Sequence, residues 1–177
     1  TEQIEAAYEY LYKFSRLMRQ VLNSSSKSLI TVAKEIEILT LYLELEALRF
    51  DDKFRYHIHI DDEEETGDIL MPSLMVQPFV ENAIWHGFAN VKGYKKINLT
   101  IYSEDDKIRC EIIDNGVGTK KSKTMKPKDK RKPFGLKASE DRIKLLHENQ
   151  NVYVIIEDIS DHQHTGTKVT IKFPKKI

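Results

Sequence analysis

The stretch VENAIWHG crowds a carboxylate, an amide and an imidazole into six positions of an otherwise apolar helical pattern. Glu81 and Asn82 offer oxygen atoms of the kind that a hard cation prefers. His86, four residues after Asn82, would lie on the same helix face. A second stretch, DNGVG, adds Asp114 and two glycines. Each stretch alone is a modest signal, because an Asp/Asn-Gly sequence is also common in β-turns.

Two helices are predicted ahead of these stretches. Residues 3–22 place apolar side chains at alternating steps of three and four, which is a heptad-like seam. The seam consists of Ile4, Ala7, Leu11, Phe14, Met18 and Val21. It could pack against its own domain or serve a bundle or dimer, and the pattern leaves both open. Thr31 is the predicted N-cap of a second helix that runs to about Phe50, without a capping box because Lys34 stands three residues on.

The rest of the chain predicts an α+β fold. Alternating patterns predict strands at 54–60, 96–102, 107–113, 152–157 and 167–173. Pro72 suits the start of a helical segment, and Pro78 must kink that segment or begin a fresh helix. A further helix is predicted at 136–148. This order favours a mixed or mostly antiparallel sheet with helices on one face.

Several other residues favour structural interpretations. His57 and His59 point to the wet face of their strand and could pair on a metal, but without a third ligand nearby they are predicted to be solvated. Cys110 is a packed thiol suited to a reducing cytosol. Residues 61–68 are predicted to be an exposed acidic turn. Residues 119–132, with eight basic side chains and one acid, are predicted to be a mobile loop.

The composition excludes some classes of protein. The 28 basic and 28 acidic residues cancel, so no global field attracts nucleic acid or anionic lipid. No apolar run approaches the roughly 20 residues needed to span a bilayer, and no signal-peptide pattern precedes the first helix. Because the chain opens without Met inside a helical pattern, we expect a fragment whose upstream part, membrane-bound or not, is absent.

The order and spacing of the motifs resemble a known superfamily. A helix with VENAIWHG precedes a strand ending in DNGVG, then come a basic loop, FGL before a helix and TGT before the last strand. This order resembles the Bergerat or GHKL ATP-binding fold shared by sensor histidine kinases, gyrase and MutL. MPSLMVQPFVENAIWHG is similar to the asparagine box of LytS/YehU-type histidine kinases. EAAYEYLYKFSRLMRQVL and EIEILTLYLELEALRF resemble the end of that family's dimerisation and phosphoacceptor region and the helix leading into its catalytic domain.

The resemblance implies a two-layer α/β sandwich at residues 51–177, preceded by a helical remnant of the dimerisation region at residues 1–50. It also implies ATP and Mg²⁺ as cofactors. Asn82 would ligate the Mg²⁺ on the ATP phosphates, and Glu81 would hold a metal-bound water or, alternatively, only be stabilised near a helix N-terminus. His86 would pack on the adenosine or, alternatively, have only a structural role. Asp114 would accept a hydrogen bond from the adenine amino group, with Thr167 completing that network.

The glycine boxes would complete the nucleotide site. Missing Cβ atoms at Gly116 and Gly118 would let the backbone lie against the nucleotide. The second box would place the free N–H groups of a helix N-terminus on the phosphates, and it comprises Gly135 and Leu136, followed by Lys137. Residues 117–134 would form a lid over the triphosphate.

The chain also departs from the family pattern. Trp85 stands where the family usually has Lys or Arg, KRKPFGL lacks additional glycines, and TGT replaces GGT. These departures concern triphosphate binding and not the fold. Lys137 or a lysine of the lid could supply the lost charge, and the alternative is that the basic lid is only a solvated loop.

The implied function is the ATP-binding catalytic region of a two-component sensor histidine kinase. No NPHFLFN-like acceptor motif occurs, so the phosphorylated histidine is expected upstream and the chain alone is expected not to autophosphorylate. The implied partners are a response regulator of the LytTR type and a second copy bound through the N-terminal helices. The implied location is the cytoplasmic side of a membrane-anchored protein. The alternative is a degenerate, non-catalytic module for dimerisation or scaffolding. A gyrase-like clamp is disfavoured, because Pro78 stands where those enzymes keep a water-activating glutamate.

Overall fold

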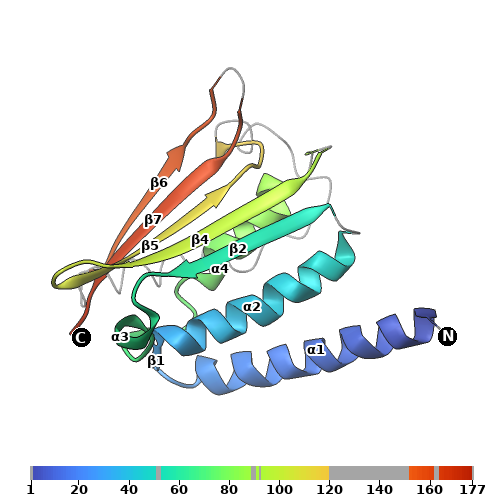
Figure 1. Cartoon of the computed structure of the whole chain (residues 1–177), viewed down its shortest axis with the longest axis horizontal. Coiled ribbons are helices and arrows are strands. Elements are labelled where there is room, and N and C mark those ends of the chain that lie inside the picture. The colour runs from blue at the N-terminus through green and yellow to red at the C-terminus, as the bar shows by residue number, and fades with distance from the viewer. Residues whose placement is uncertain are drawn as a thin grey trace.

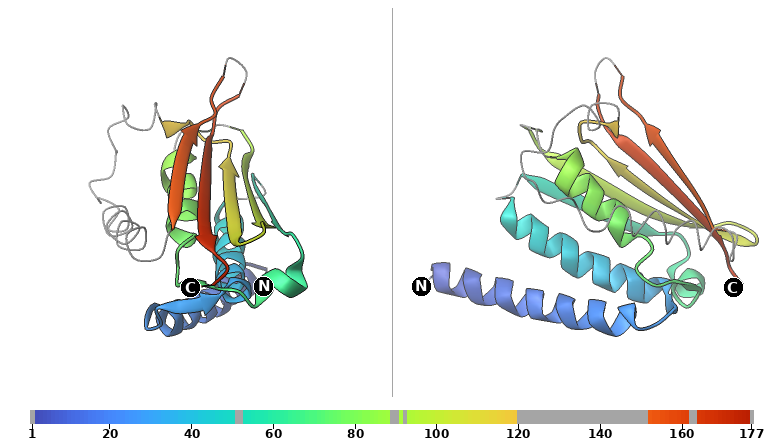
Figure 2. Two further views of the ribbon diagram at one scale, coloured as in Figure 1. Left: turned by 90° about the vertical axis from the view of Figure 1, so that its left-hand side faces the viewer. Right: turned by 180° about the vertical axis from the view of Figure 1, so that it is seen from behind.

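A computed structural model gives the architecture of the chain (Figure 1). It describes residues 2–50, 53–88, 91, 93–119, 152–161 and 164–176. The described elements form an α+β fold in which helices pack on a five-stranded sheet and a long N-terminal helix lies outside them (Figures 1 and 2). The predicted fold class is therefore confirmed.

The N-terminal helices α1 (Glu2–Ser25) and α2 (Val32–Arg49) lie side by side (Figure 1). Nζ of Lys13 in α1 lies 2.6 Å from a carboxylate oxygen of Glu44 in α2, and this ion pair links the two helices. The side chain of Thr31 accepts a hydrogen bond of 3.2 Å from the Lys34 N–H, so Thr31 is the N-cap of α2, as predicted.

The apolar seam of α1 faces away from the rest of the chain. Ile4 is 74% exposed, Leu11 63% and Phe14 44%, whereas Leu17, which is not part of the seam, joins the core. Of the seam only Val21 packs against the core. Packing against its own domain is therefore the wrong explanation of the seam, and its use in a dimer stays a prediction.

The main sheet is mixed, and all five of its strands were predicted. It contains β2 (Phe54–Ile60), β4 (Lys95–Ser103), β5 (Lys107–Asp114), β6 (Tyr153–Asp158) and β7 (Thr167–Pro174), in the order β2-β4-β5-β7-β6. β2 pairs parallel with β4, and the other neighbours pair antiparallel. His57 and His59 are exposed on β2, as expected for solvated residues.

A second, two-stranded sheet was not predicted. It pairs β1 (Leu29–Thr31) with β3 (Leu70–Pro72). The predicted helix start at Pro72 is wrong, because Pro72 ends β3 opposite Leu29. The predicted acidic turn at residues 61–68 contains a short helix, α3 (Glu63–Gly67). The predicted helix at 136–148 and residues 120–132 of the predicted loop lie outside the described residues.

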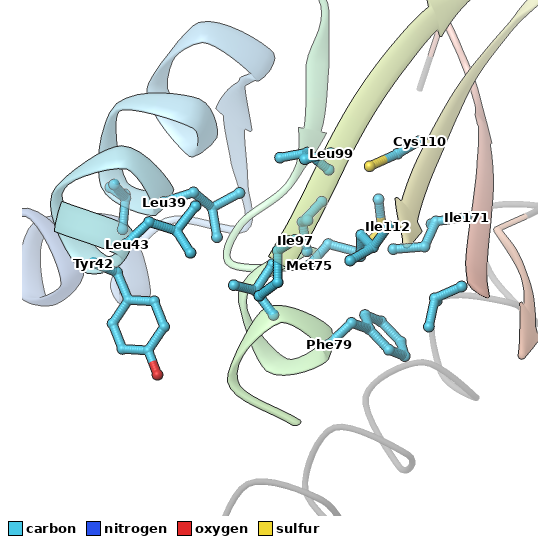
Figure 3. Close-up of a cluster of buried hydrophobic side chains, with 14 of the residues drawn as sticks. Leu39, Tyr42, Leu43, Met75, Phe79, Ile97, Leu99, Cys110, Ile112 and Ile171 are labelled. Carbon is cyan, nitrogen blue, oxygen red and sulfur yellow. The ribbon is translucent and has the colours of Figure 1, made fainter. Parts of the chain in front are cut away.

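One core joins α2 to the sheet and to the helix that follows β3 (Figure 3). Leu39 and Leu43 from α2 meet Met75 and Phe79 and the sheet residue Ile97 there (Figure 3). Side chains from β5 and β7 extend the same core. The predicted domain division at residue 50 stays a prediction. The buried cluster itself is continuous from α2 to the sheet.

Cys110 belongs to this core and is 1% exposed. Burial raises the pKa of its thiol, so the reactive thiolate is disfavoured. The expectation of a packed thiol is confirmed.

Candidate functional site

Asn82 and His86 lie on one continuous helix, made of α4 (Gln77–Asn82) and the π-helical segment η1 (Ala83–Gly87). Of the two alternatives for Pro78, a fresh helix is the one observed: it begins one residue earlier, at Gln77, and Pro78 lies in its first turn, where its missing N–H costs nothing. A π-helical turn is frequent at functional sites. Asn82 and His86 are both half-buried, which leaves each of them able to meet a ligand.

The end of β5 presents Asp114, which is only 6% exposed. Its carboxylate accepts a hydrogen bond of 2.7 Å from the Gly116 N–H and another from the Thr167 N–H. Burial raises the pKa of Asp114 to about 6, against the effect of these two donors. Thr167 is the residue paired with Asp114 across β5 and β7. The two residues predicted to recognise adenine are therefore direct neighbours.

The helix and the end of β5 meet through glycines. A Cβ added to Gly116 would lie 2.6 Å from the Cα of Gly87 and 2.7 Å from a carboxylate oxygen of Asp114. The Val117 N–H donates to the Gly87 carbonyl at 2.9 Å. This contact fixes the end of the Asn82 helix against Asp114. Gly87 directly follows His86 but was not predicted as a site residue. A glycine at the end of a helix is commonly only its terminator, so the sequence gives no sign of the contact.

Two more glycines pack against backbone and side chains of the same region. Gly118 has φ +79°, and a Cβ there would clash with Ser160 Oγ and lie 2.8 Å from a carboxylate oxygen of Asp158. A Cβ at Gly166 would clash with the Asp114 carbonyl oxygen. Contacts within the protein thus already require glycine at these positions, whatever the nucleotide adds. No sequence signal pointed to Asp158.

Glu81 lies on the side of the helix that faces α2. Its carboxylate accepts a hydrogen bond of 2.8 Å from Gln77 Nε2, and burial raises its pKa. Burial, together with the nearby charge of Glu81, also raises the pKa of Tyr42 and of Glu46 in α2. Glu81 is not in the first turn, so stabilisation by the helix N-terminus is the wrong alternative. Its predicted role with a metal-bound water stays a prediction.

Trp85 also lies on the α2 side and is 57% exposed. The guanidinium carbon of Arg49 lies 4.6 Å from the centre of the Trp85 ring and 4.9 Å from that of Phe50. Arg49 Nη2 also lies 3.0 Å from a carboxylate oxygen of Glu46. α2 therefore places a cation against the tryptophan that stands where a basic residue was expected.

The described residues fit a nucleotide with a bound Mg²⁺. His86 Nε2 is buried and has no hydrogen-bond partner among the residues that the structure describes, so a polar ligand atom would satisfy it. Mg²⁺ is usually bound through one or two protein oxygens, with phosphates and water completing its shell. The half-buried amide of Asn82 can supply one such oxygen.

Three predicted phosphate-site residues, Gly135, Leu136 and Lys137, lie outside the described residues, as do residues 120–134 of the predicted lid. Among the described helices, none combines the length and apolar character needed to cross a bilayer.

Comparisons with known proteins point to one kind of enzyme. A family model described as histidine kinase matches residues 1–54. The sensor protein LytS of Oceanobacillus iheyensis is 39% identical over 116 residues, which are 64% of this chain and 19% of that protein. The sensor histidine kinase/phosphatase LytS of Staphylococcus aureus is 35% identical over 120 residues, 67% of this chain and 20% of that protein. The chain thus spans about a fifth of the length of these curated relatives.

Solved structures show the same fold at low sequence identity. The catalytic domain of histidine kinase ThkA has a TM-score of 0.58 and 15% identity, over 84% of this chain and 97% of that one. The kinase domain of a blue-light activated histidine kinase from Erythrobacter litoralis has a TM-score of 0.57 and 15% identity, over 97% of this chain and 82% of that one. ThkA in complex with the response regulator TrrA has a TM-score of 0.56 and 15% identity, over 99% of this chain and 51% of that one.

Proposed function

Since the chain is a LytS-family sensor histidine kinase region with the fold of histidine kinase catalytic domains, we propose that it binds ATP with Mg²⁺ and supplies the γ-phosphate to a histidine outside residues 1–177. The observation that carries the proposal is the meeting of two elements. The Asn82 helix ends against Asp114 through the contact of Gly87 with Gly116. A nucleotide at this junction can touch Asp114 and Thr167 at one end and Asn82 at the other.

The base would be selected by Asp114. A buried carboxylate attracts the amino group of adenine and repels the carbonyl oxygen that guanine carries in its place. The Gly116 and Thr167 N–H groups hold this carboxylate in one orientation, so little reorganisation is needed on binding. His86, whose Nε2 has no hydrogen-bond partner within the described part of the chain, would line the adenosine.

The phosphates would be placed by the helix. Asn82 would contribute an oxygen ligand to Mg²⁺, which when bound neutralises charge on the phosphates. The protein's share of phosphoryl transfer is then to hold the γ-phosphate in line with the acceptor nitrogen and to offset its charge. Gly135, Leu136 and Lys137 remain proposed phosphate contacts, and Arg49 against Trp85 provides positive charge beside the helix.

The proposed partners follow from the family and from α1. The exposed seam residues of α1, Ile4, Leu11, Phe14 and Met18, offer an apolar stripe to a second copy of the chain. A response regulator, of the LytTR type by resemblance, would receive the phosphate. We further propose that the region lies on the cytoplasmic side of a membrane-anchored protein.

Nucleotide competition tests the proposal. ATP should displace a labelled ATP analogue, GTP should compete far more weakly, and Asp114→Asn should weaken ATP binding by about 1.5–3 kcal/mol, the range for a hydrogen bond to a charged group. Equal competition by ATP and GTP would contradict the role of Asp114. No binding of either nucleotide would favour the alternative, a degenerate module for dimerisation or scaffolding.

The metal role of Asn82 has a separate test. Asn82→Ala should abolish the increase in ATP affinity that Mg²⁺ produces, while leaving the melting temperature of the nucleotide-free protein nearly unchanged. A large loss of melting temperature would instead indicate a structural role.

Phosphoryl transfer tests the placement of the acceptor. Residues 1–177 should not label themselves from γ-labelled ATP, whereas a longer chain with the upstream histidine should acquire an acid-labile label. Acid-labile labelling of residues 1–177 would place the acceptor within this sequence.

A further inference from the structure

A buried carboxylate joins α2 to the start of the Asn82 helix. Glu35, in the first turn of α2, is 1% exposed. It accepts hydrogen bonds of 2.9 Å from the Leu74 N–H, 2.9 Å from the Val76 N–H and 3.4 Å from the Gln77 N–H. Burying an ionised group is costly unless hydrogen bonds replace its water. The three backbone donors just before and at the first residue of α4 provide this replacement.

The backbone that Glu35 holds is strained. Leu74 has φ 54°, in the left-handed region, which is costly for a residue with a bulky side chain. Such a conformation persists only where the surroundings impose it. The bond from the Leu74 N–H to Glu35 is one of these constraints, because it fixes the direction of the N–H just before the helix begins.

The same segment is tied to the corner between α1 and α2. Ser73 Oγ donates to the Ser24 carbonyl at 2.6 Å, and the Ser73 N–H donates to the Ser28 carbonyl at 3.1 Å. The β1 and β3 strands pair directly beside these bonds. The start of α4 is therefore fixed to the N-terminal helices by main-chain and side-chain bonds from residues about forty positions away.

We propose that Glu35 is a positioning residue that sets the helix carrying Asn82 relative to α2, so that the N-terminal helices determine where the metal ligand stands. The role of Glu35 in catalysis rests on the proposed function, whereas its contacts with the start of α4 do not. Asn82 ends α4, which begins at Gln77, and a helix transmits a displacement of its start to its end. Because phosphoryl transfer depends on alignment, a small displacement there is sufficient to weaken it.

The test compares Glu35→Gln with Glu37→Gln in the full 177-residue chain. Glu37 lies two residues further along α2 and makes exposed bonds with Lys34 and Gln20, so it controls for charge loss on the same helix. Glu35→Gln places an amide N–H₂ against one of the backbone donors. We expect it to lower the Mg²⁺-induced gain in ATP affinity roughly tenfold, while the affinity for adenosine, which has no phosphate, stays unchanged. Glu37→Gln should change neither quantity.

Two readouts do not need ATP. Amide hydrogen exchange should accelerate at residues 74, 76 and 77 and along α4, while the amides of β4 and β5 keep their protection. Trp85 is the single tryptophan and lies on the same helix, so its emission should shift in Glu35→Gln and not in Glu37→Gln.

The outcomes separate the two proposals. Faster exchange throughout the sheet in Glu35→Gln would mean general destabilisation and would overturn the positioning role. Faster exchange at residues 74–77 with an unchanged Mg²⁺ effect on ATP affinity would also overturn it. If the unaltered protein shows no Mg²⁺ effect at all, the proposed function fails. Exchange and Trp85 emission then decide the positioning role alone, and unchanged values in Glu35→Gln would overturn it.

Discussion

The two sides of the Asn82 helix are built differently. Towards β5, the contact is made by backbone, with Gly87 against Gly116 and a hydrogen bond from the Val117 N–H. Towards α2, it is made by large and charged side chains, with Glu81 near Glu46 and with Trp85 under Arg49. The β5 side has no room for an added atom, whereas the long side chains on the α2 side can move.

Because of this difference, the helix is fixed on its β5 side and adjustable on its α2 side. A backbone contact sets the position of the helix end beside Asp114 within narrow limits. A contact between flexible side chains tolerates small changes in the position of α2. We therefore expect substitutions on the β5 side to act through sterics and those on the α2 side through charge.

Gly116→Ala should have the largest effect on stability. Its Cβ would meet the Gly87 backbone at 2.6 Å, and neither chain can move cheaply, so unfolding in urea should show a loss of about 3 kcal/mol. Gly93→Ala is the matched control, because no atom of the residues that the structure describes lies within 4 Å of a Cβ there. A loss of equal size in both variants would remove the distinction between the two sides of the helix.

Lower pH should weaken adenosine binding through Asp114. Its pKa in the free protein is raised to about 6 by burial, and binding requires the ionised form, so affinity is complete above pH 6 and falls as the carboxylate takes up a proton. The loss should approach about tenfold per pH unit well below 6. Adenosine has no phosphate that titrates here. The profile of Asp114→Asn should be flat, and an equally steep profile would assign the pH effect to another group.

Arg49→Ala should have a moderate effect, on the α2 side. It removes a cation from the faces of Trp85 and Phe50 and breaks a pair with Glu46, at a cost of about 1 kcal/mol for partly exposed contacts. The emission of Trp85 should shift at the same time. Arg55→Ala, an exposed arginine on β2, is the control. Equal losses in the two variants would show that the stacked arginine adds nothing specific.

Glu81→Gln should have the smallest effect. Burial raises the pKa of Glu81, so its ionised form disfavours the fold as pH rises, and the neutral amide should stabilise the protein at neutral pH by at most about 0.5 kcal/mol, since water screens a half-buried charge. The Mg²⁺ gain in ATP affinity separates the two roles of Glu81. Survival of that gain, in contrast to Asn82→Ala, would favour a role on the α2 side alone, whereas its loss would support the predicted role with a metal-bound water.

Sequence reasoning predicted the elements with strong periods and the residues with distinctive chemistry. The Thr31 cap and the five strands of the main sheet follow from local patterns, whereas the association of Asp114 with Thr167 was implied by the family resemblance. β1 and β3 were missed because three residues carry too little period to be recognised. Glu35 was missed because a glutamate in a helix is normally a surface residue, and its partners lie about forty residues away.

The face of α1 shows a second limit. A heptad-like seam indicates that a helix packs against something, but not against what. The structure buries Leu17 against α2 and leaves Leu11 and Phe14 exposed. Whether α1 buries the face with Leu17 or the face with Leu11 and Phe14 depends on tertiary contacts, which no local pattern contains.

The parallel pairing of β2 with β4 has a consequence for how the protein folds. Parallel strands cannot be joined by a tight turn, and here residues 61–94, which include α3, β3 and α4, form the connection. The pairing of these strands therefore closes a long loop, a slow step in folding. Asn82 lies inside that loop, and the end of its helix at Gly87 meets Asp114 only after the loop has closed. Nucleotide binding during refolding should thus appear with the last kinetic phase, which makes ATP a probe of complete folding and not of early collapse.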